Sequence, residues 1–153
     1  MGGFRRQGIR IRPPAMRDLA RFRDAQADHL AAALAELRAG AKRSHWMWFV
    51  FPQHVALGRS GTARRYGIHG IDHARAYLTD ADLAANLRAA FEAMLGNEGR
   101  TAEAVLGPVD AMKLRSSATL FDAAGDGGAA ARVLAAFYGG APDGETLRLL
   151  RDG

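Results

Sequence analysis

Residues 42–53 read KRSHWMWFVFPQ, and this stretch says more about the fold than any other. It holds both tryptophans of the chain and two of its seven phenylalanines. The run Trp46–Phe51 is apolar throughout, so we expect it to be buried. The polar residues that flank it can donate hydrogen bonds: Lys42, Arg43, His45 and Gln53. The pattern is typical of a core segment that also forms one wall of a pocket.

Length and composition limit the number of domains and the kinds of site that the protein can have. The chain has 153 residues, which suits one domain with its own core. It has no cysteine, which excludes a disulfide framework, a thiolate metal site and cysteine catalysis. No apolar run approaches the roughly 20 residues of a membrane span, and residues 1–14 lack the apolar core of a signal peptide. We therefore expect a cytoplasmic protein with no membrane association and no cofactor.

The net charge of +5 is unevenly distributed along the chain. Residues 1–23 carry seven arginines and one aspartate, and residues 38–75 carry seven cations and one aspartate. Such basic blocks favour anionic partners, although solvated surface arginines give the same pattern. Residues 1–15 are rich in Gly, Arg and Pro, which predicts a flexible basic tail before a helical domain at 16–151.

Helical signals dominate that domain. Leucines at helical spacing between 18 and 39 predict one helix, or two helices broken near residues 27–28. The sequence after residue 59 predicts several further helices. They begin at or near Ser60 or Thr62, Asp72, Asp80, Thr101 and Pro108, most of which are residues that favour the first positions of a helix. The aromatic run favours irregular or extended backbone, or a short helix from His45 if Ser44 caps it. The expected fold is a single compact all-α domain with an irregular aromatic segment.

A second polar cluster reads KLRSSAT at residues 113–119. On a helix, Lys113, Ser116 and Ser117 share one face, whereas Arg115 points elsewhere. The cluster could hold an anion through charge-assisted hydrogen bonds. Alternatively, the two serines only let another helix approach closely.

The candidate site joins this cluster to the aromatic segment. Trp46 and Trp48 could stack on a base or could simply belong to the core. His45 is the first candidate for acid–base catalysis, or it caps a helix. The candidate ligand-binding residues are Arg43, His45, Trp46, Trp48, Gln53, Arg59, Lys113, Arg115, Ser116 and Ser117. No histidine spacing predicts a metal site, and no phosphate-binding loop or nucleophile elbow is present.

The motifs resemble those of a known family. The residues involved are Lys42 to Gln53, Leu57 to Ser60, Arg64 to Ile68, Ala74 to Leu78 and Lys113 to Phe121. They are similar to an uncharacterised bacterial domain-of-unknown-function family, the eighteen-ten family, often labelled calpastatin-like. The resemblance covers roughly residues 17–150 and implies a mainly helical fold with no established activity. Ala118 replaces an expected methionine, and residues 79–82 replace a His-Pro turn. The calpastatin label does not fit a domain with an apolar pattern.

Whether the protein is an enzyme stays open, and three functions are compatible with these residues. The first is binding of a small anionic, nucleotide-like ligand, of which an ADP-ribose derivative is one example, because the helical pattern distantly resembles a family proposed to act on such compounds. The second is a structural or interaction protein with no ligand pocket. The third is a nucleic-acid-binding module that uses the basic arm.

Overall fold

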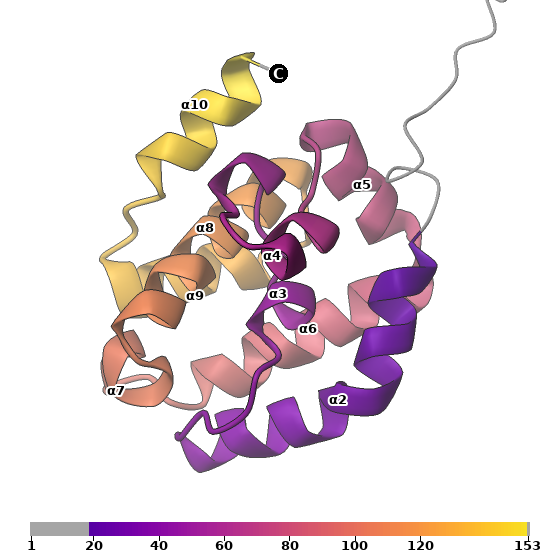
Figure 1. Cartoon of the computed structure of the whole chain (residues 1–153). Helices are drawn as coiled ribbons and strands as arrows, with labels where there is room; N and C mark the ends of the chain where they lie inside the picture. Colours follow the sequence, from indigo (N-terminus) through magenta and orange to yellow (C-terminus); the bar gives the residue numbers. More distant parts are fainter. Residues whose placement is uncertain (1–18, 153) are drawn as a thin grey trace, which may run out of the picture.

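A long helix at the start of the described residues supports one side of the molecule (Figure 1). The structure is a computed structural model that describes residues 19–152. Helix α2 (Ala20–Ala39) is continuous. Of the two alternatives for this region, one helix or two, the structure therefore has one. It ends at Gly40, whose φ of 73° is left-handed and suits glycine. The tail predicted for residues 1–15 lies outside the described residues.

The aromatic segment follows α2 and forms only one helical turn, α3 (Met47–Val50). The extended alternative is therefore wrong for these four residues. Ser44 does not cap the turn either, because its hydroxyl donates to Glu36 and Trp46 occupies the capping position. The residues on both sides of α3 are not helical, as expected for an irregular segment.

The remaining elements are short helices, as predicted. They are the 3-10 turn η1 (Val55–Leu57), α4 (Gly61–Arg65), α5 (Ile71–Thr79), α6 (Ala81–Leu95), α7 (Ala102–Leu106), α8 (Pro108–Ala124), α9 (Ala129–Tyr138) and α10 (Gly144–Asp152). Side chains of Ser60, Asp80 and Thr101 cap α4, α6 and α7. Pro108 opens α8, where its missing N–H costs no hydrogen bond. The all-α prediction is confirmed.

The packing places α6 and α8 at the centre. Helix α2 packs on α6, and α5, α7 and α9 pack on α8. Figure 1 shows the short helices α3 and α4 lying across the front of this assembly, with α10 projecting at the top. Residues far apart in sequence, from α3, α4 and α8, therefore gather on one face. Between residues 19 and 152, no helix combines the length and apolar character that crossing a bilayer requires.

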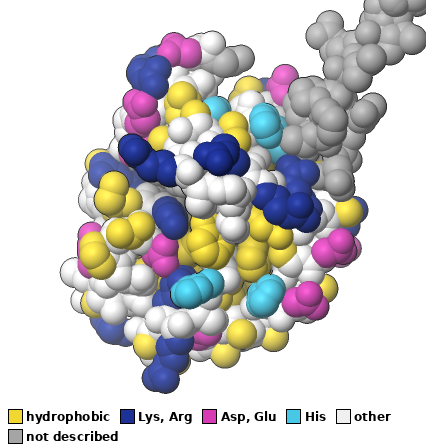
Figure 2. Space-filling view, in the orientation of Figure 1, with side chains coloured by type: hydrophobic (Ala, Val, Ile, Leu, Met, Phe, Trp, Pro, Cys, Tyr) yellow, Lys and Arg dark blue, Asp and Glu magenta, His cyan; other side chains and the backbone are white. Residues whose placement is uncertain are grey.

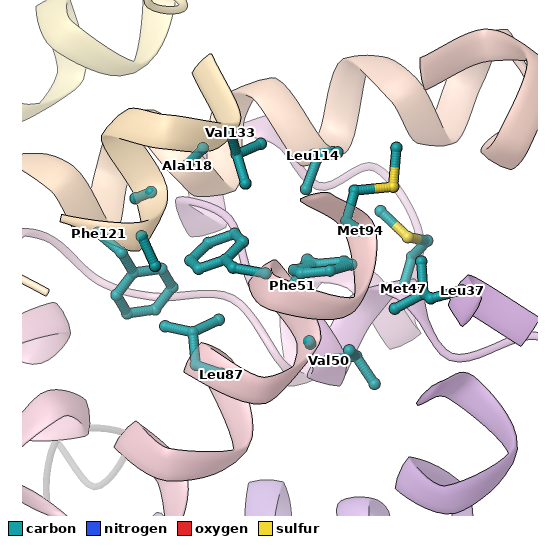
Figure 3. Packing of buried hydrophobic residues seen from close by; sticks show 14 of the residues in the cluster. Leu37, Met47, Val50, Phe51, Leu87, Met94, Leu114, Ala118, Phe121 and Val133 are labelled. Carbon is teal, nitrogen blue, oxygen red and sulfur yellow. The ribbon is translucent and has the colours of Figure 1, made fainter. Parts of the chain in front are cut away.

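The aromatic run supplies much of the core. Five of its six side chains are buried, and Trp48 alone is half-buried. Phe51 stacks on Phe91 of α6 with ring centroids 5.3 Å apart. Figure 3 shows Phe51 among buried side chains from several helices, including Met47, Met94 and Leu114. The predicted burial of the run is confirmed except at Trp48, which is only partly buried.

Candidate functional site

A single carboxylate fixes the start of the aromatic segment. Glu36, in the last turns of α2, accepts the backbone N–H groups of Arg43 at 2.6 Å and Ser44 at 2.9 Å. It also accepts the Ser44 hydroxyl at 2.5 Å and the Trp46 indole N–H at 3.0 Å. The loop after α2 is thereby held in one conformation, and the indole nitrogen of a buried tryptophan finds its partner.

The protonation of Glu36 follows from these bonds. Partial burial acts to raise the pKa of its carboxyl, but the hydrogen bonds from Ser44, Arg43 and Trp46 favour the charged form more strongly. The pKa falls from 4.5 to about 2 as a result. The anchor is charged at every pH near neutrality.

Each tryptophan carries a lysine on its ring, and both lysines share one carboxylate. The ammonium of Lys42 lies 5.1 Å from the Trp46 ring centroid, and that of Lys113 lies 5.3 Å from the Trp48 ring centroid. Asp110 of α8 pairs with Lys42 at 3.0 Å and with Lys113 at 3.4 Å. These contacts tie the aromatic segment to α8, so the two motifs that the sequence singled out do meet.

A cavity of about 530 Å³ opens beside Trp48. Four parts of the chain line it: α3, the segment from residue 53 to 63, α8, and the start of α10. The lining residues are Trp48, Gln53, Leu57, Gly58, Arg59, Ser60, Ala63, Val109, Met112, Lys113, Ser116, Asp143 and Glu145. Figure 2 shows this face hollowed, with hydrophobic side chains visible in the hollow and Lys and Arg side chains around it.

Most charges in the lining already have partners. Lys113 pairs with Asp110, and Glu145 pairs with Arg148 at 2.6 Å. The Asp143 carboxylate caps α10 by accepting the N–H and hydroxyl of Thr146 at 2.9 and 2.6 Å. The guanidinium of Arg59 has no hydrogen bond or ion pair with any residue from 19 to 152. Of the charges that line the cavity, Arg59 is thus the one with no partner among residues 19–152.

Two uncharged polar groups also face the cavity. Gln53 uses its backbone carbonyl to accept the N–H of Ile68 at 2.9 Å, while its side-chain amide forms no hydrogen bond within the described chain. Ser116 donates its hydroxyl to the carbonyl of Met112 at 3.2 Å, so its oxygen can still accept. The amide can both donate and accept, which suits the edge of a heterocycle or an amide.

The rim of the cavity is apolar on the α8 side. Among residues 19–152, the large hydrophobic side chains that are exposed are Val109 at 65% and Met112 at 72%. Both are lining residues. Apolar side chains beside a concave, partly polar surface favour a site that receives a ligand.

A histidine fixes the segment that carries Arg59. The Nδ1 atom of His54 accepts the N–H of Ala56 at 3.0 Å and caps η1. Burial, and then the nearby charge of His69, lower the pKa of His54. The neutral ring is required, because a protonated Nδ1 could not accept this bond. Within the described part of the chain, no group of three or more side chains is placed to hold a metal ion.

Five of the predicted site residues line the cavity: Trp48, Gln53, Arg59, Lys113 and Ser116. The other five are not brought to it. Arg43 is exposed, and its backbone N–H bonds to Glu36. His45 is exposed, with its ring edge-on to Trp48 at a centroid distance of 6.4 Å.

The other three of these five residues are buried or are held by contacts within the protein. Trp46 is 1% exposed and belongs to the core. Arg115 donates to the carbonyl of Ala141 at 3.0 Å and lies over the Tyr138 ring. Ser117 is fully buried, and its hydroxyl has no hydrogen-bond partner in residues 19–152. Sequence spacing had placed Ser117 with Lys113 and Ser116, but the turn between adjacent residues sends Ser117 into the core.

The candidate ligand-binding residues chosen from the sequence did not include the acidic partners of the site. Glu36 and Asp143 occupy ordinary polar positions that nothing local marks, whereas Asp110 lies one helical turn before Lys113 and could have been paired with it. Glu36 lies ten residues before Trp46, across the end of α2 and a loop, so its bond to the indole depends on the fold. Asp143 comes from a distant segment, which no local pattern reveals.

The comparisons with known proteins bear on the family of the chain. A search of the curated proteins found no significant match. Among solved structures, the chain is similar to the conserved hypothetical protein Rv1873 from Mycobacterium tuberculosis, with 45% identity and a TM-score of 0.81. That similarity covers 88% of this chain and 96% of the other. The family model described as "Protein of unknown function (DUF1810)" matches residues 16–150. The resemblance seen in the aromatic and serine motifs is confirmed, and the chain belongs to the DUF1810 family of proteins of unknown function.

Proposed function

We propose that the cavity beside Trp48 binds a small anionic, nucleotide-like ligand. The observation that carries the proposal is the meeting of two remote motifs around one hollow, where Arg59 has no partner within the part of the chain that the structure describes. A volume of about 530 Å³ lies within the range of about 300–1,000 Å³ that is usual for ligand pockets. An ADP-ribose derivative has the chemistry that this lining would select, namely a planar base and phosphate.

Each lining group has a role in this proposal. The Trp48 indole offers a stacking surface for a base, and Val109 and Met112 extend the apolar wall. The Arg59 guanidinium binds phosphate through paired N–H groups. The Gln53 amide bonds to a base edge, and the Ser116 oxygen accepts from a ligand N–H or O–H. The proposal concerns binding, because His45, the first candidate for acid–base work, lies outside the lining.

The other two functions receive less support. A structural or interaction protein would need no cleft beside the aromatic segment, and the cavity favours ligand binding over it. A nucleic-acid module would use the basic arm, most of which precedes residue 19. The charges around the cavity are largely paired, which argues for a small ligand with one or two phosphates over a long polyanion.

The test compares two arginines. Isothermal titration with ADP-ribose and AMP is carried out on the wild type, on Arg59→Gln and on Arg43→Gln. Arg43 is a matched control, because it is exposed and flanks the same segment but does not line the cavity. We expect Arg59→Gln to weaken binding about tenfold or more, as loss of a hydrogen bond to a charged group does, and Arg43→Gln to have little effect. Absence of binding to the wild type, or equal weakening in both variants, would contradict the proposal.

A further inference from the structure

The stacking surface of Trp48 is occupied by the protein itself. The ammonium of Lys113 lies 5.3 Å from the centroid of the indole ring, and both residues line the cavity. A cation in this position is attracted by the electron-rich ring face. A base that stacks there must displace the ammonium first. The rest of the environment of Lys113 decides what that displacement costs.

Lys113 is the more loosely held of the two lysines on Asp110. Lys42 approaches Asp110 to 3.0 Å, its side chain is only 10% exposed, and it also donates to the carbonyl of Ser44 at 2.7 Å. Lys113 approaches Asp110 to 3.4 Å, its side chain is 26% exposed, and its ammonium makes no hydrogen bond to any other residue between 19 and 152. Asp110 therefore shares one negative charge between a fixed lysine and a looser one. Lys113 is the side chain free to move when a ligand enters.

We propose that Lys113 makes the cavity selective for anionic ligands by covering the Trp48 indole until an anion draws it away. This role rests on the proposed function of the cavity and deepens it. A neutral ring that displaces Lys113 leaves a partly buried ammonium with less compensation, which is unfavourable. A ligand that also carries phosphate gives the displaced ammonium a new charge-assisted partner. The same movement that penalises a neutral ligand thus rewards an anionic one.

Arg59 and Lys113 differ in this respect. Arg59 has no partner among the described residues to give up, so it adds affinity for an anion without opposing a neutral ligand. Lys113 must leave the indole and Asp110, so it opposes neutral ligands and favours anionic ones. Removing either cation weakens binding of an anion. Only removal of Lys113 strengthens binding of a neutral ring.

The experiment measures AMP and adenosine, which share the base and sugar and differ in the phosphate. Dissociation constants are determined by isothermal titration for the wild type, Lys113→Met and Lys42→Met. Methionine keeps a long, flexible apolar side chain and removes the charge. Lys42→Met is the matched control, because it removes the other lysine from the same carboxylate at a residue that does not line the cavity.

We expect the wild type to prefer AMP by about tenfold or more. Lys113→Met should weaken AMP about tenfold and tighten adenosine several-fold, so that the preference disappears, whereas Lys42→Met should keep it. A second variant, Asp110→Asn, releases Lys113 from its carboxylate and should tighten AMP. Thermal melting of each variant checks that it folds.

The outcomes separate the two proposals. If the wild type binds AMP and Lys113→Met keeps the AMP preference, the selectivity role of Lys113 is overturned while the cavity remains a binding site. Adenosine binding that weakens in Lys113→Met would also overturn the role, because the lysine would then be helping the neutral ring. If the wild type binds neither compound, the proposed function itself fails, and the role of Lys113 falls with it.

Discussion

Two tryptophans separated by one residue have opposite environments. Trp46 is 1% exposed, its indole N–H is bonded to Glu36, and its ring packs in the core. Trp48 is half-buried, its ring carries Lys113, and it lines the cavity. Successive residues of a helical turn are rotated by about 100°, so positions two apart point to nearly opposite sides. One short turn can therefore anchor the fold on one side and form a binding wall on the other.

The largest expected difference comes from truncating each ring. Trp46→Ala should lower the free energy of unfolding by about 3–5 kcal/mol, because it leaves a core cavity and removes a partner of Glu36. Trp48→Ala should lower it by only about 1–2 kcal/mol, because that ring is only partly buried. Urea unfolding followed by circular dichroism measures both. Equal losses would contradict the division between the two rings.

The anchor on the Trp46 side is tested by Glu36→Gln. We expect a loss of about 1.5–3 kcal/mol in the free energy of unfolding at pH 7, because the amide cannot supply the charge that strengthens the hydrogen bonds. The pKa of Glu36 is lowered from 4.5 to about 2 in the folded protein, so its contribution is complete above pH 4.5. It is lost as the pH falls from 4.5 towards 2. Urea titrations at several pH values should show the gap between wild type and Glu36→Gln closing over that range, and a constant gap would refute the anchor.

On the Trp48 side of the molecule, the backbone at Gly67 packs closely against Val55 of η1. A Cβ atom there would lie 2.6 Å from the Cα of Val55, so Gly67→Ala must push η1 away and should cost about 1–3 kcal/mol. Gly61→Ala is the control, because nothing lies within 4 Å of its Cβ position at the start of α4. Gly67→Ala should also disturb Arg59 and weaken nucleotide binding. Thermal melting and titration of both variants make the comparison.

The smallest effect concerns pH and His54. Its pKa is lowered in the folded protein, chiefly by burial and then by the charge of His69, so the unfolded chain binds protons more readily. The free energy of unfolding should fall as the pH drops below 6.5, the ordinary pKa of histidine. His54→Asn keeps a hydrogen-bond acceptor for the N–H of Ala56. Its free energy of unfolding should fall less between pH 7.5 and 5 than that of the wild type.

Local chemistry explains which parts of the fold were predictable from the sequence. The caps at Ser60, Asp80 and Thr101 act within three residues, so the chain itself shows where those helices begin. The aromatic turn was harder, because β-type residues become helical there only through burial against α2 and α6. Tertiary packing overrides local preference at that point.

The candidate site divides in the same way. Arg59 and Lys113 could be proposed from residue type alone, and both line the cavity. Ser117 was assigned to the same face as Ser116, but a helix separates neighbours by about 100° and only one of them can face the hollow. Asp110 lies three residues before Lys113 on α8, a spacing that the sequence shows. Asp143 reaches the site only through the packing of α10 on α8, which no local pattern reveals.

The most direct test of the account uses the two tryptophans as separate reporters. In Trp46→Phe only Trp48 fluoresces, and in Trp48→Phe only Trp46 fluoresces. Addition of AMP should change the emission of the first protein, because the ligand replaces Lys113 on the indole, and should leave that of the second nearly unchanged. A response from the Trp46 reporter alone, or no response from either, would contradict the assignment of Trp48 to a ligand site.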